Sequence, residues 1–426
     1  MKVTVIGAGK MGLPLACQFA NQGASVVVCD IRKSVVETIN QGICPIDEPG
    51  VPELLKEAVA NGTLYASTDT TAAVAQSQVI VVIVPVLLTS DLDAELSIIE
   101  SVSRQIAEGL KPGAMVSYET TLPVGGTRRL VPILESSGLK AGKDFHLAFS
   151  PERVKSQLVL KKLTLTPKIV GGITPEAAKY AEEFYSKYLG APVINVKTLE
   201  AAEMVKLAGM IYRDVNIALA NELARYADRV GIDFIDVVEA ANTNGEASLL
   251  SPGIGVGGHC TPVYPYFLIR DSQRKGILNL LAEQARQIND SQPSYILDLL
   301  ESRWRSLHGH KALILGLGFR PQVKEHIFSP AFQLRDELTK REIEVQIHDP
   351  FYSDDEIREL GFVPCKLTDS NLPEIVILNT AHSIYYDLDF QLLAKKGVRA
   401  IVDGRDMWNS EKIRSTGLVY IGVGKQ

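Results

Sequence analysis

The sequence predicts an α/β fold in which two doubly wound parallel sheets are joined by a central helical domain with one long helix. Short β-branched runs alternate with longer helical patterns through the first part of the chain. Residues 199–229 contain no proline and are rich in Ala, Glu, Leu and Arg, and the alternation then begins again at Lys311. We therefore expect sheet domains over residues 1–195 and 301–426, with the helical domain over 196–300.

The strands are recognised as short apolar runs between turn signals. They are expected at residues 2–6, 25–29, 79–84, 114–119 and 146–149 in the first domain, and at 311–315, 344–348, 375–379 and 400–402 in the second. Helices are expected to begin near Met11 and to span residues 331–340. The repeated rhythm resembles an internal duplication of one fold.

The middle of the chain shows helical patterns without strands. The long helix over 199–229 is followed by helices near 232–241 and 278–288. A helix of about 30 residues is about 45 Å long, which is more than a small domain needs. We expect it to link the two sheet domains and to supply the surface of a homodimer or higher homo-oligomer. A spacer within one chain is the alternative.

Composition narrows the possible functions. The chain has 426 residues and a net charge of −6, whereas proteins that bind nucleic acid regardless of sequence carry a basic excess. No apolar run reaches the ~18 residues of a membrane span, and no signal peptide precedes the first strand. A cytoplasmic protein without nucleic-acid or membrane partners is expected. The five scattered cysteines form no CxxC pair, so we expect neither a disulfide framework nor a metal site.

A glycine-rich turn follows the first strand and leads into a helix. It reads Gly7-Ala8-Gly9-Lys10-Met11-Gly12. The first glycine permits the tight turn, the second lets the backbone approach a pyrophosphate, and the third allows the helix to pack closely on the strand. This is the fingerprint of a Rossmann dinucleotide-binding domain, and the two sheet domains are predicted to be Rossmann-like.

The second strand ends at Asp30, at the spacing from Gly12 that the fingerprint requires. An acid there accepts hydrogen bonds from ribose hydroxyls and repels a 2′-phosphate, so NAD is the expected cofactor. Arg32 and Lys33 could soften that preference. The other residues expected to line the cofactor are Lys10, Met11, Ile31, Arg32 and Pro85.

A second glycine turn, Gly316-Leu317-Gly318-Phe319-Arg320, lacks the third glycine. We expect a phosphate-proximal loop in which Phe319 and Arg320 contact a nucleotide substrate, with Arg320 placed to meet its diphosphate. A simple strand-to-helix turn is the alternative.

Cys260 ends a loop that holds four glycines in the seven residues before His259. Such a loop suits a nucleophile, and Gly255, Gly257 and Gly258 would let a sugar lie against the main chain. With NAD available, a thiol can capture an aldehyde as a thiohemiacetal, which loses hydride to become a thioester that water cleaves to an acid. The pattern indicates oxidation of an alcohol to a carboxylate through two hydride transfers.

Eight segments spread over the chain act together as a signature. They are residues 7–16, 30, 48–50, 119–125, 150–154, 202–206, 255–260 and 403–405. With them the chain resembles, end to end, the UDP-glucose/GDP-mannose dehydrogenase family. The pattern Lys324-Glu325 with Ser329-Pro330 makes it most similar to the UDP-N-acetylhexosamine 6-dehydrogenase branch, which acts on UDP-GlcNAc or UDP-ManNAc and serves pathways such as polysaccharide biosynthesis.

The resemblance implies a role for each matching residue. Cys260 is similar to the thioester-forming nucleophile, and Lys206 to the lysine that stabilises the oxyanion. Glu152 resembles the acid associated with thioester hydrolysis, and Thr121 a hydroxyl that positions water. Further implied contacts are Arg153 and Val154 with the substrate, Thr121 and Lys324 with NAD, and Arg405 with the sugar nucleotide of a neighbouring subunit.

Three positions depart from the family pattern. Tyr264 stands where an aspartate is common, Met210 where an asparagine is common, and Val86-Leu87 where Thr-Pro is usual. Methionine can neither polarise water nor donate to an oxyanion. Four-electron oxidation at C6, giving a uronic acid, is the leading hypothesis. An aldehyde-forming or redox-neutral enzyme such as an epimerase, and a non-catalytic paralogue that binds sugar nucleotides, are the alternatives.

Overall fold

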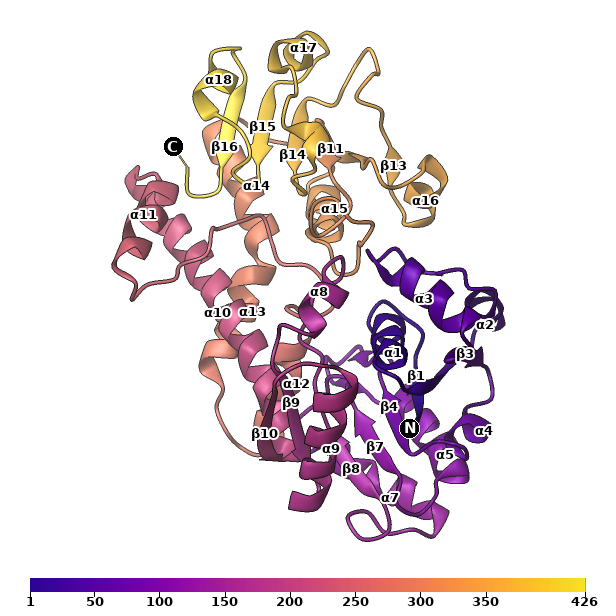
Figure 1. Ribbon diagram of the computed structural model, residues 1–426. Helices are drawn as coiled ribbons and strands as arrows, with labels where there is room; N and C mark the ends of the chain where they lie inside the picture. The colour runs from indigo at the N-terminus through magenta and orange to yellow at the C-terminus, as the bar shows by residue number, and fades with distance from the viewer. Residues whose placement is uncertain (426) are drawn as a thin grey trace. The chain divides into compact units, whose positions relative to one another are not determined.

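The computed structural model describes residues 1–425 and divides into two compact units. The first unit comprises Met1–Gly209 with Tyr266–Gly276, and the second comprises Met210–Pro265 and the chain from Ile277 onward. Each unit contains one doubly wound sheet, and one long helix begins in the first unit and ends in the second (Figure 1). The predicted fold class is confirmed.

The sheet of the first unit has eight strands in the order β10-β9-β8-β7-β4-β1-β2-β3. Their bounds are β1 Lys2–Ile6, β2 Ser25–Cys29, β3 Leu64–Ser67, β4 Val79–Val82, β7 Met115–Tyr118, β8 His146–Phe149, β9 Lys168–Gly172 and β10 Val193–Thr198. All neighbouring strands run parallel except β8 and β9, which are antiparallel. The sequence did not predict β3, β9 or β10.

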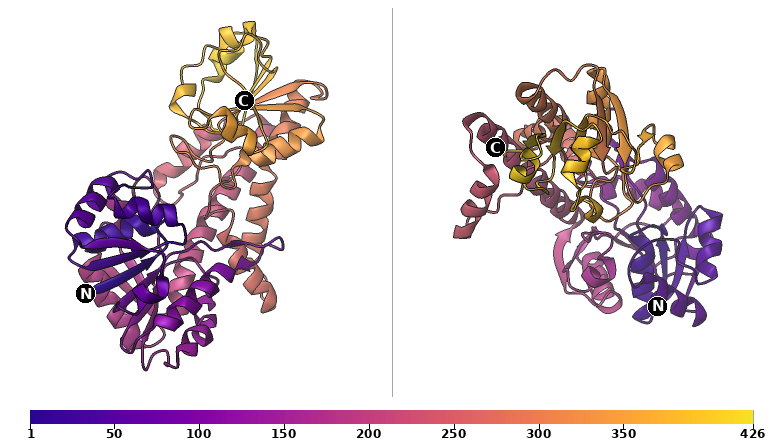
Figure 2. Two further views of the ribbon diagram at one scale, coloured as in Figure 1. Left: turned by 90° about the vertical axis from the view of Figure 1, so that its right-hand side faces the viewer. Right: turned by 90° about the horizontal axis from the view of Figure 1, so that it is seen from above.

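Helices cover both faces of this sheet (Figure 2). Alternate strand residues such as Val79 and Val81 join the core beneath α1 and α9, where Phe19 meets Phe184 with ring centroids 5.1 Å apart. Ile80, between them, is fully buried on the opposite face. The helices of this unit are α1 Gly12–Asn21, α2 Lys33–Asn40, α3 Val51–Ala60, α4 Thr70–Val74, α5 Ser97–Gly109, α6 Gly126–Arg129, α7 Val131–Leu134, η1 Glu135–Ser137, α8 Val159–Leu163 and α9 Pro175–Tyr188.

A small antiparallel hairpin, β5 Leu87–Leu88 with β6 Ala94–Glu95, begins at Leu87, the second residue of the pair that stands in place of the expected Thr-Pro. Two arginines of the helix α12 (Tyr264–Arg274) hold it. Arg270 donates to the Asp91 carbonyl over 2.7 Å, and Arg274 pairs with Asp93 at 2.5 Å. These contacts explain why residues 266–276 belong to the first unit.

The sheet of the second unit has six parallel strands in the order β13-β12-β11-β14-β15-β16. They are β11 Lys311–Leu315, β12 Glu344–His348, β13 Val363–Pro364, β14 Ile375–Leu378, β15 Ala400–Asp403 and β16 Val419–Gly422. The strands β3-β2-β1-β4-β7-β8 of the first sheet follow the same order. The shared order supports the predicted internal duplication.

The two faces of the second sheet have separate cores. Ile314 lies in a cluster with residues of α10 and α14, and its neighbour Leu313 lies in the cluster of the other face. The remaining helices are α10 Leu199–Val230, α11 Phe234–Ala241, η2 Asn242–Asn244, α13 Leu280–Asp290, α14 Gln292–Arg303, α15 Pro330–Lys340, α16 Asp354–Glu359, η3 Ser383–Tyr385, α17 Phe390–Lys395 and α18 Ser410–Arg414. No helix within residues 1–425 is long and apolar enough to cross a membrane.

Candidate active site

The first glycine turn has the geometry that its sequence predicts. Gly7 has φ +108°, and a Cβ there would lie 2.5 Å from the Ile83 carbonyl oxygen. A Cβ on Gly12 would lie 1.9 Å from the Gly7 carbonyl oxygen, so only glycine lets α1 pack this closely. Gly9 has no atom within 4 Å of the corresponding position, which leaves its backbone open toward a ligand. The turn therefore fits a dinucleotide pyrophosphate.

Asp30 lies at the end of β2 beside this turn. Its carboxylate accepts hydrogen bonds from the Ala8 amide over 3.2 Å and the Arg32 amide over 2.9 Å. Burial acts to raise the pKa of Asp30, but the hydrogen bonds from Arg32 and Ala8 outweigh it, so the pKa lies below its usual range. Ile31 is 89% exposed and Arg32 also faces solvent, as expected for residues that meet a ribose or a base. NAD binding at this edge would use Asp30 as the ribose acceptor.

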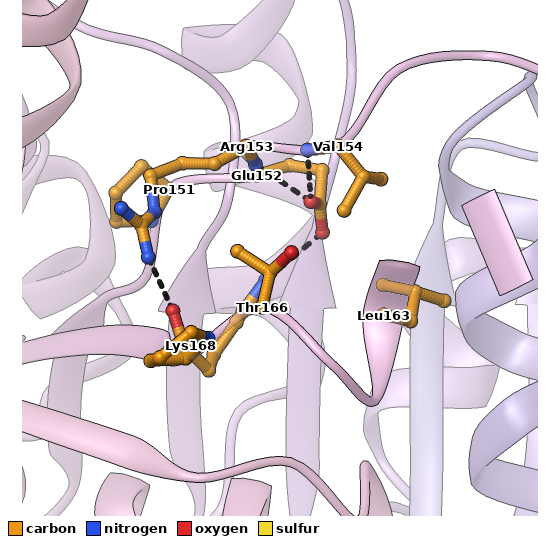
Figure 3. Close-up of a pocket in the computed structure, with 8 residues that line it drawn as sticks. Pro151, Glu152, Arg153, Val154, Leu163, Thr166 and Lys168 are labelled. Carbon is orange, nitrogen blue, oxygen red and sulfur yellow. Dashed lines mark hydrogen bonds and ion pairs between the residues drawn. The ribbon is translucent and has the colours of Figure 1, made fainter. Parts of the chain in front are cut away.

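Glu152 and Lys206 come together in the first unit, although they are distant in sequence. The Lys206 ammonium donates to the Glu152 carbonyl oxygen over 2.7 Å, and both side chains are largely buried. The Glu152 carboxylate accepts from the amides of Arg153 at 2.6 Å and Val154 at 2.9 Å (Figure 3). Thr121, also buried, follows β7 in the same unit. Two of the four predicted catalytic residues are therefore in direct contact.

A buried lysine that the sequence analysis missed lies beside them. The Lys168 ammonium is 3.1 Å from one Glu152 carboxylate oxygen and 2.5 Å from a carboxylate oxygen of Glu119. Its signal in the sequence was a lysine placed directly before the apolar pair Ile-Val and two glycines. The cluster borders a cavity of about 10 Å³ lined by Thr166, whose side chain points toward the Glu152 carboxylate (Figure 3).

Cys260 is a half-buried free thiol in the second unit, at the end of a loop packed tightly on its own chain. A Cβ on Gly257 would lie 2.5 Å from the Cβ of Phe319, and one on Gly255 would lie 2.9 Å from Pro330. The Gly258 amide donates to the Ile327 carbonyl over 3.0 Å. Close packing against Phe319 and Pro330 thus accounts for Gly257 and Gly255. Sugar contact through the same main chain stays a prediction.

The second glycine turn is held by Asp349, which follows β12. One carboxylate oxygen accepts from the amides of Leu317 at 2.7 Å and Gly318 at 3.1 Å. These two amides already donate to a carboxylate of the chain, so they are not available to bind a phosphate. Arg320 lies 3.4 Å from Glu325 and stays a predicted contact of the substrate diphosphate.

Lys324 was predicted to contact NAD, and Arg405 to contact the sugar nucleotide of a neighbouring subunit. In the structure both side chains bind groups of their own chain. Lys324 pairs with Glu356 at 2.5 Å and lies over the Tyr352 ring. The Arg405 guanidinium donates to the Asn379 carbonyl over 2.6 Å, and burial lowers the pKa of Arg405 to about 10. Their reach to NAD and to a neighbouring subunit stays a prediction.

The remaining predicted residues divide between the units. Lys10, Met11, Pro85, Arg153 and Val154 belong to the first unit with the glycine turn, Asp30, Glu152 and Lys206. Cys260, the loop glycines, Phe319, Arg320, Lys324 and Arg405 belong to the second. All five cysteines are free, and residues 1–425 contain no group of three or more His, Cys, Asp or Glu side chains that could hold a metal.

Three family models match the chain in order. Their descriptions are the UDP-glucose/GDP-mannose dehydrogenase family NAD binding domain over residues 1–189, its central domain over 200–291 and its UDP binding domain over 313–410. The chain belongs to the UDP-glucose/GDP-mannose dehydrogenase family. It is an NAD-dependent UDP-sugar dehydrogenase, which confirms the predicted family, cofactor and class of enzyme.

Individual relatives are similar over nearly the whole length. The UDP-N-acetyl-D-mannosamine dehydrogenase of Pyrococcus horikoshii is 32% identical over 432 residues, which cover 100% of this chain and 99% of that protein. The NDP-N-acetyl-D-galactosaminuronic acid dehydrogenase of Ralstonia nicotianae is 32% identical, with 96% and 97% covered. The solved structure of the Pyrococcus horikoshii UDP-D-ManNAc dehydrogenase matches with a TM-score of 0.87 at 30% identity, covering 100% and 99% of the two chains.

Proposed function

We propose that this enzyme oxidises the C6 alcohol of a UDP-N-acetylhexosamine, UDP-ManNAc or UDP-GlcNAc, to the uronic acid through a thioester on Cys260. The observation that carries the proposal is the buried contact between Lys206 and the Glu152 carbonyl, which holds an ammonium and a carboxylate in one place. An oxyanion and a hydrolytic water need those two groups.

Each residue has a defined part in the proposed sequence of steps. NAD⁺ supplies the hydride acceptor for two oxidations. The Cys260 thiol adds to the aldehyde carbon, and the resulting thiohemiacetal becomes a thioester when it loses hydride. Water then attacks the thioester carbon while Glu152 takes a proton from the water. The C–S bond breaks to release the acid, and the proton passes from Glu152 to the departing thiolate, which restores the thiol and the carboxylate. Lys206 stabilises the oxyanion of the tetrahedral species, and Thr121 orients the water.

The names of the relatives support an acetamido sugar. Two similar proteins are named UDP-N-acetyl-D-mannosamine dehydrogenase and NDP-N-acetyl-D-galactosaminuronic acid dehydrogenase. The sequence pattern from Lys324 to Pro330 favours the same class of sugar. We propose that the enzyme is cytoplasmic and serves a pathway such as polysaccharide biosynthesis.

A second candidate function is motivated by two substitutions. Met210 and Tyr264 replace groups that could donate to an oxyanion or polarise water, and both side chains are half-buried. Removing one oxyanion donor can slow an enzyme of this kind on the order of 10²-fold. An enzyme that stops at the aldehyde, or returns the hydride as an epimerase does, would not need those groups.

The experiment that separates these functions counts NADH per sugar. Purified protein is incubated with NAD⁺ and, in parallel, UDP-ManNAc, UDP-GlcNAc, UDP-glucose and GDP-mannose, and mass spectrometry identifies the product. Two NADH per sugar and a uronic acid are expected. One NADH, or none with an altered sugar, would favour the second candidate. Cys260→Ala should abolish acid formation, whereas a non-catalytic paralogue would be unaffected by it.

We also infer a homodimer built on the long helix α10. Tyr212, Leu219 and Tyr226 repeat every seventh residue and are 64%, 42% and 65% exposed. Residues at this spacing share one face of a helix, and an apolar stripe left exposed there is typical of a subunit interface. The stripe supports the predicted oligomer.

A further inference from the structure

Lys168 occupies an unusual place for a charged residue. It is the first residue of β9, an interior strand of the first sheet, and its side chain is 5% exposed. Taking an ammonium out of water is costly unless it is paired and hydrogen-bonded. A lysine at this position therefore implies specific partners.

Because β9 runs antiparallel to β8, its first residue, Lys168, lies at the end of the strands where Glu152 follows β8. Phe149, the last residue of β8, stands opposite Gly171 of β9. Continuing that register past the end of β8 brings Glu152 opposite Lys168. If β9 ran parallel to β8, its first residue would lie at the opposite end of the strands, away from Glu152. The strand direction thus serves this contact.

The Lys168 ammonium is held by two carboxylates and one aromatic ring. Its ammonium lies 2.5 Å from Glu119 and 3.1 Å from Glu152, and 5.3 Å from the centre of the Tyr185 ring. The Tyr185 hydroxyl donates to the second carboxylate oxygen of Glu119 over 2.8 Å and also lies 2.8 Å from the Ser117 hydroxyl. The lysine and both carboxylates form one connected network.

The network fixes both oxygens of the Glu152 carboxylate. One oxygen accepts from the amides of Arg153 and Val154, and the other faces Lys168. The carboxylate therefore has one orientation, directly beside the carbonyl that binds Lys206. Without Lys168, one oxygen would lose its charged partner.

One ammonium pairs with two carboxylates, so one negative charge of the network is not balanced and the network can bind one proton. Burial raises the pKa of Glu119 to about 7 in spite of Lys168, with Glu152 adding to the rise. Burial also acts to raise the pKa of Glu152, but Lys168 and the amides of Val154 and Arg153 outweigh it, so its pKa is lowered. Of the two carboxylates, Glu119 therefore binds a proton more readily, and Glu152 more readily stays anionic.

We propose that Lys168 is a positioning residue for thioester hydrolysis, which holds Glu152 as an oriented anion ready to accept the proton of the attacking water. The inference rests on the proposed function, because it assigns Lys168 a part in the step that consumes the Cys260 thioester. Both hydride transfers precede that step. Loss of Lys168 should therefore slow hydrolysis selectively and leave the earlier oxidations in place.

The test uses Lys168→Met, which keeps most of the length of the side chain and removes its charge. With NAD⁺ and the sugar nucleotide, we expect a rapid burst of NADH followed by turnover at least about 10-fold slower than wild type. Loss of a positioning residue should cost less than loss of the general base itself, which contributes on the order of 10²-fold or more. Intact-mass spectrometry after acid quenching should show the sugar-nucleotide adduct on Cys260. Lys168→Arg, which restores a cation, should reduce that adduct toward the wild-type level.

Lys140→Met is the matched control, because it removes an ammonium that pairs with Glu135 at 2.8 Å on the surface. It should show wild-type turnover and no adduct. Uniform slowing of all steps in Lys168→Met without an adduct, or an equal adduct in Lys168→Arg, would overturn the proposal. If Lys168→Met does not fold, Glu119→Gln decides. An adduct in that variant would show that Lys168 serves Glu119 instead.

The wild-type enzyme separates this inference from the function beneath it. Fewer than two NADH per sugar in the wild type would overturn the proposed function and the role of Lys168 together. Two NADH per sugar in the wild type, with no adduct in Lys168→Met, would overturn the role of Lys168 alone.

Discussion

Two glycines of the first turn should respond to alanine in opposite ways. In Gly12→Ala the new Cβ lies 1.9 Å from the Gly7 carbonyl oxygen, so α1 must retreat by about 1.5 Å to reach ordinary contact. Overpacking of this kind costs about 1–3 kcal/mol, and each kcal/mol lowers Tm by roughly 2–4 °C in a domain of this size. We expect Gly12→Ala to melt roughly 5 °C lower than wild type.

Gly9→Ala should leave the fold intact, because no atom lies within 4 Å of the new Cβ. The methyl group would instead occupy the face of the turn that is open toward the pyrophosphate. NAD affinity should fall at least about tenfold, or about 1.4 kcal/mol. Thermal melting without NAD and calorimetric titration with NAD measure the two effects. Wild-type NAD affinity in Gly9→Ala, or equal destabilisation of both variants, would refute the reasoning.

Three further predictions concern charge and assembly. Because the pKa of Glu119 is raised to about 7 by burial, the folded state holds an extra proton between about pH 4.5 and 7, and stability falls as pH rises through that range. Glu119→Gln should flatten this part of the Tm profile, and an unchanged slope would contradict the assignment. Asp30→Ala should weaken NAD and, with Arg32 released, improve NADP relative to NAD, measured as the ratio of kcat/KM values. Leu219→Glu with Tyr226→Glu should convert the inferred dimer to a monomer in light scattering, while a persisting dimer would place the interface elsewhere.

The cofactor site could be predicted because its signals are local. The glycines and Asp30 lie on consecutive elements, and each has a backbone or charge requirement that few residue types meet. The strand β9 could not be predicted, because its residues do not favour a strand locally. Lys168 and the pair Gly171 and Gly172 are poor strand formers, yet a Cβ on Gly171 would lie 2.0 Å from the Thr198 carbonyl oxygen. Glycine there serves close packing, which only the tertiary structure reveals.

The contacts of Lys168 could not be predicted for a related reason. They depend on the direction of β9, and the alternation of strands and helices indicated a uniformly parallel sheet. In the same way, the glycines before Cys260 indicated a loop near a sugar, whereas their packing against Phe319 and Pro330 arises from chain segments far apart in sequence. Sequence patterns identified candidate functional residues, but they did not identify the residues that these contact in the folded chain.

The division of the chain also bears on how the protein is made. Residues 266–276 complete the first unit, and Arg270 and Arg274 within them hold the hairpin near Asp93. During translation this unit cannot finish folding until residue 276 has been synthesised, when residues 210–265 of the second unit have already been made. Domains usually fold in order from the N-terminus as they emerge. Here the first unit is still incomplete when synthesis of the second unit begins. A protein truncated before residue 266 would lack part of the first unit and part of the second unit.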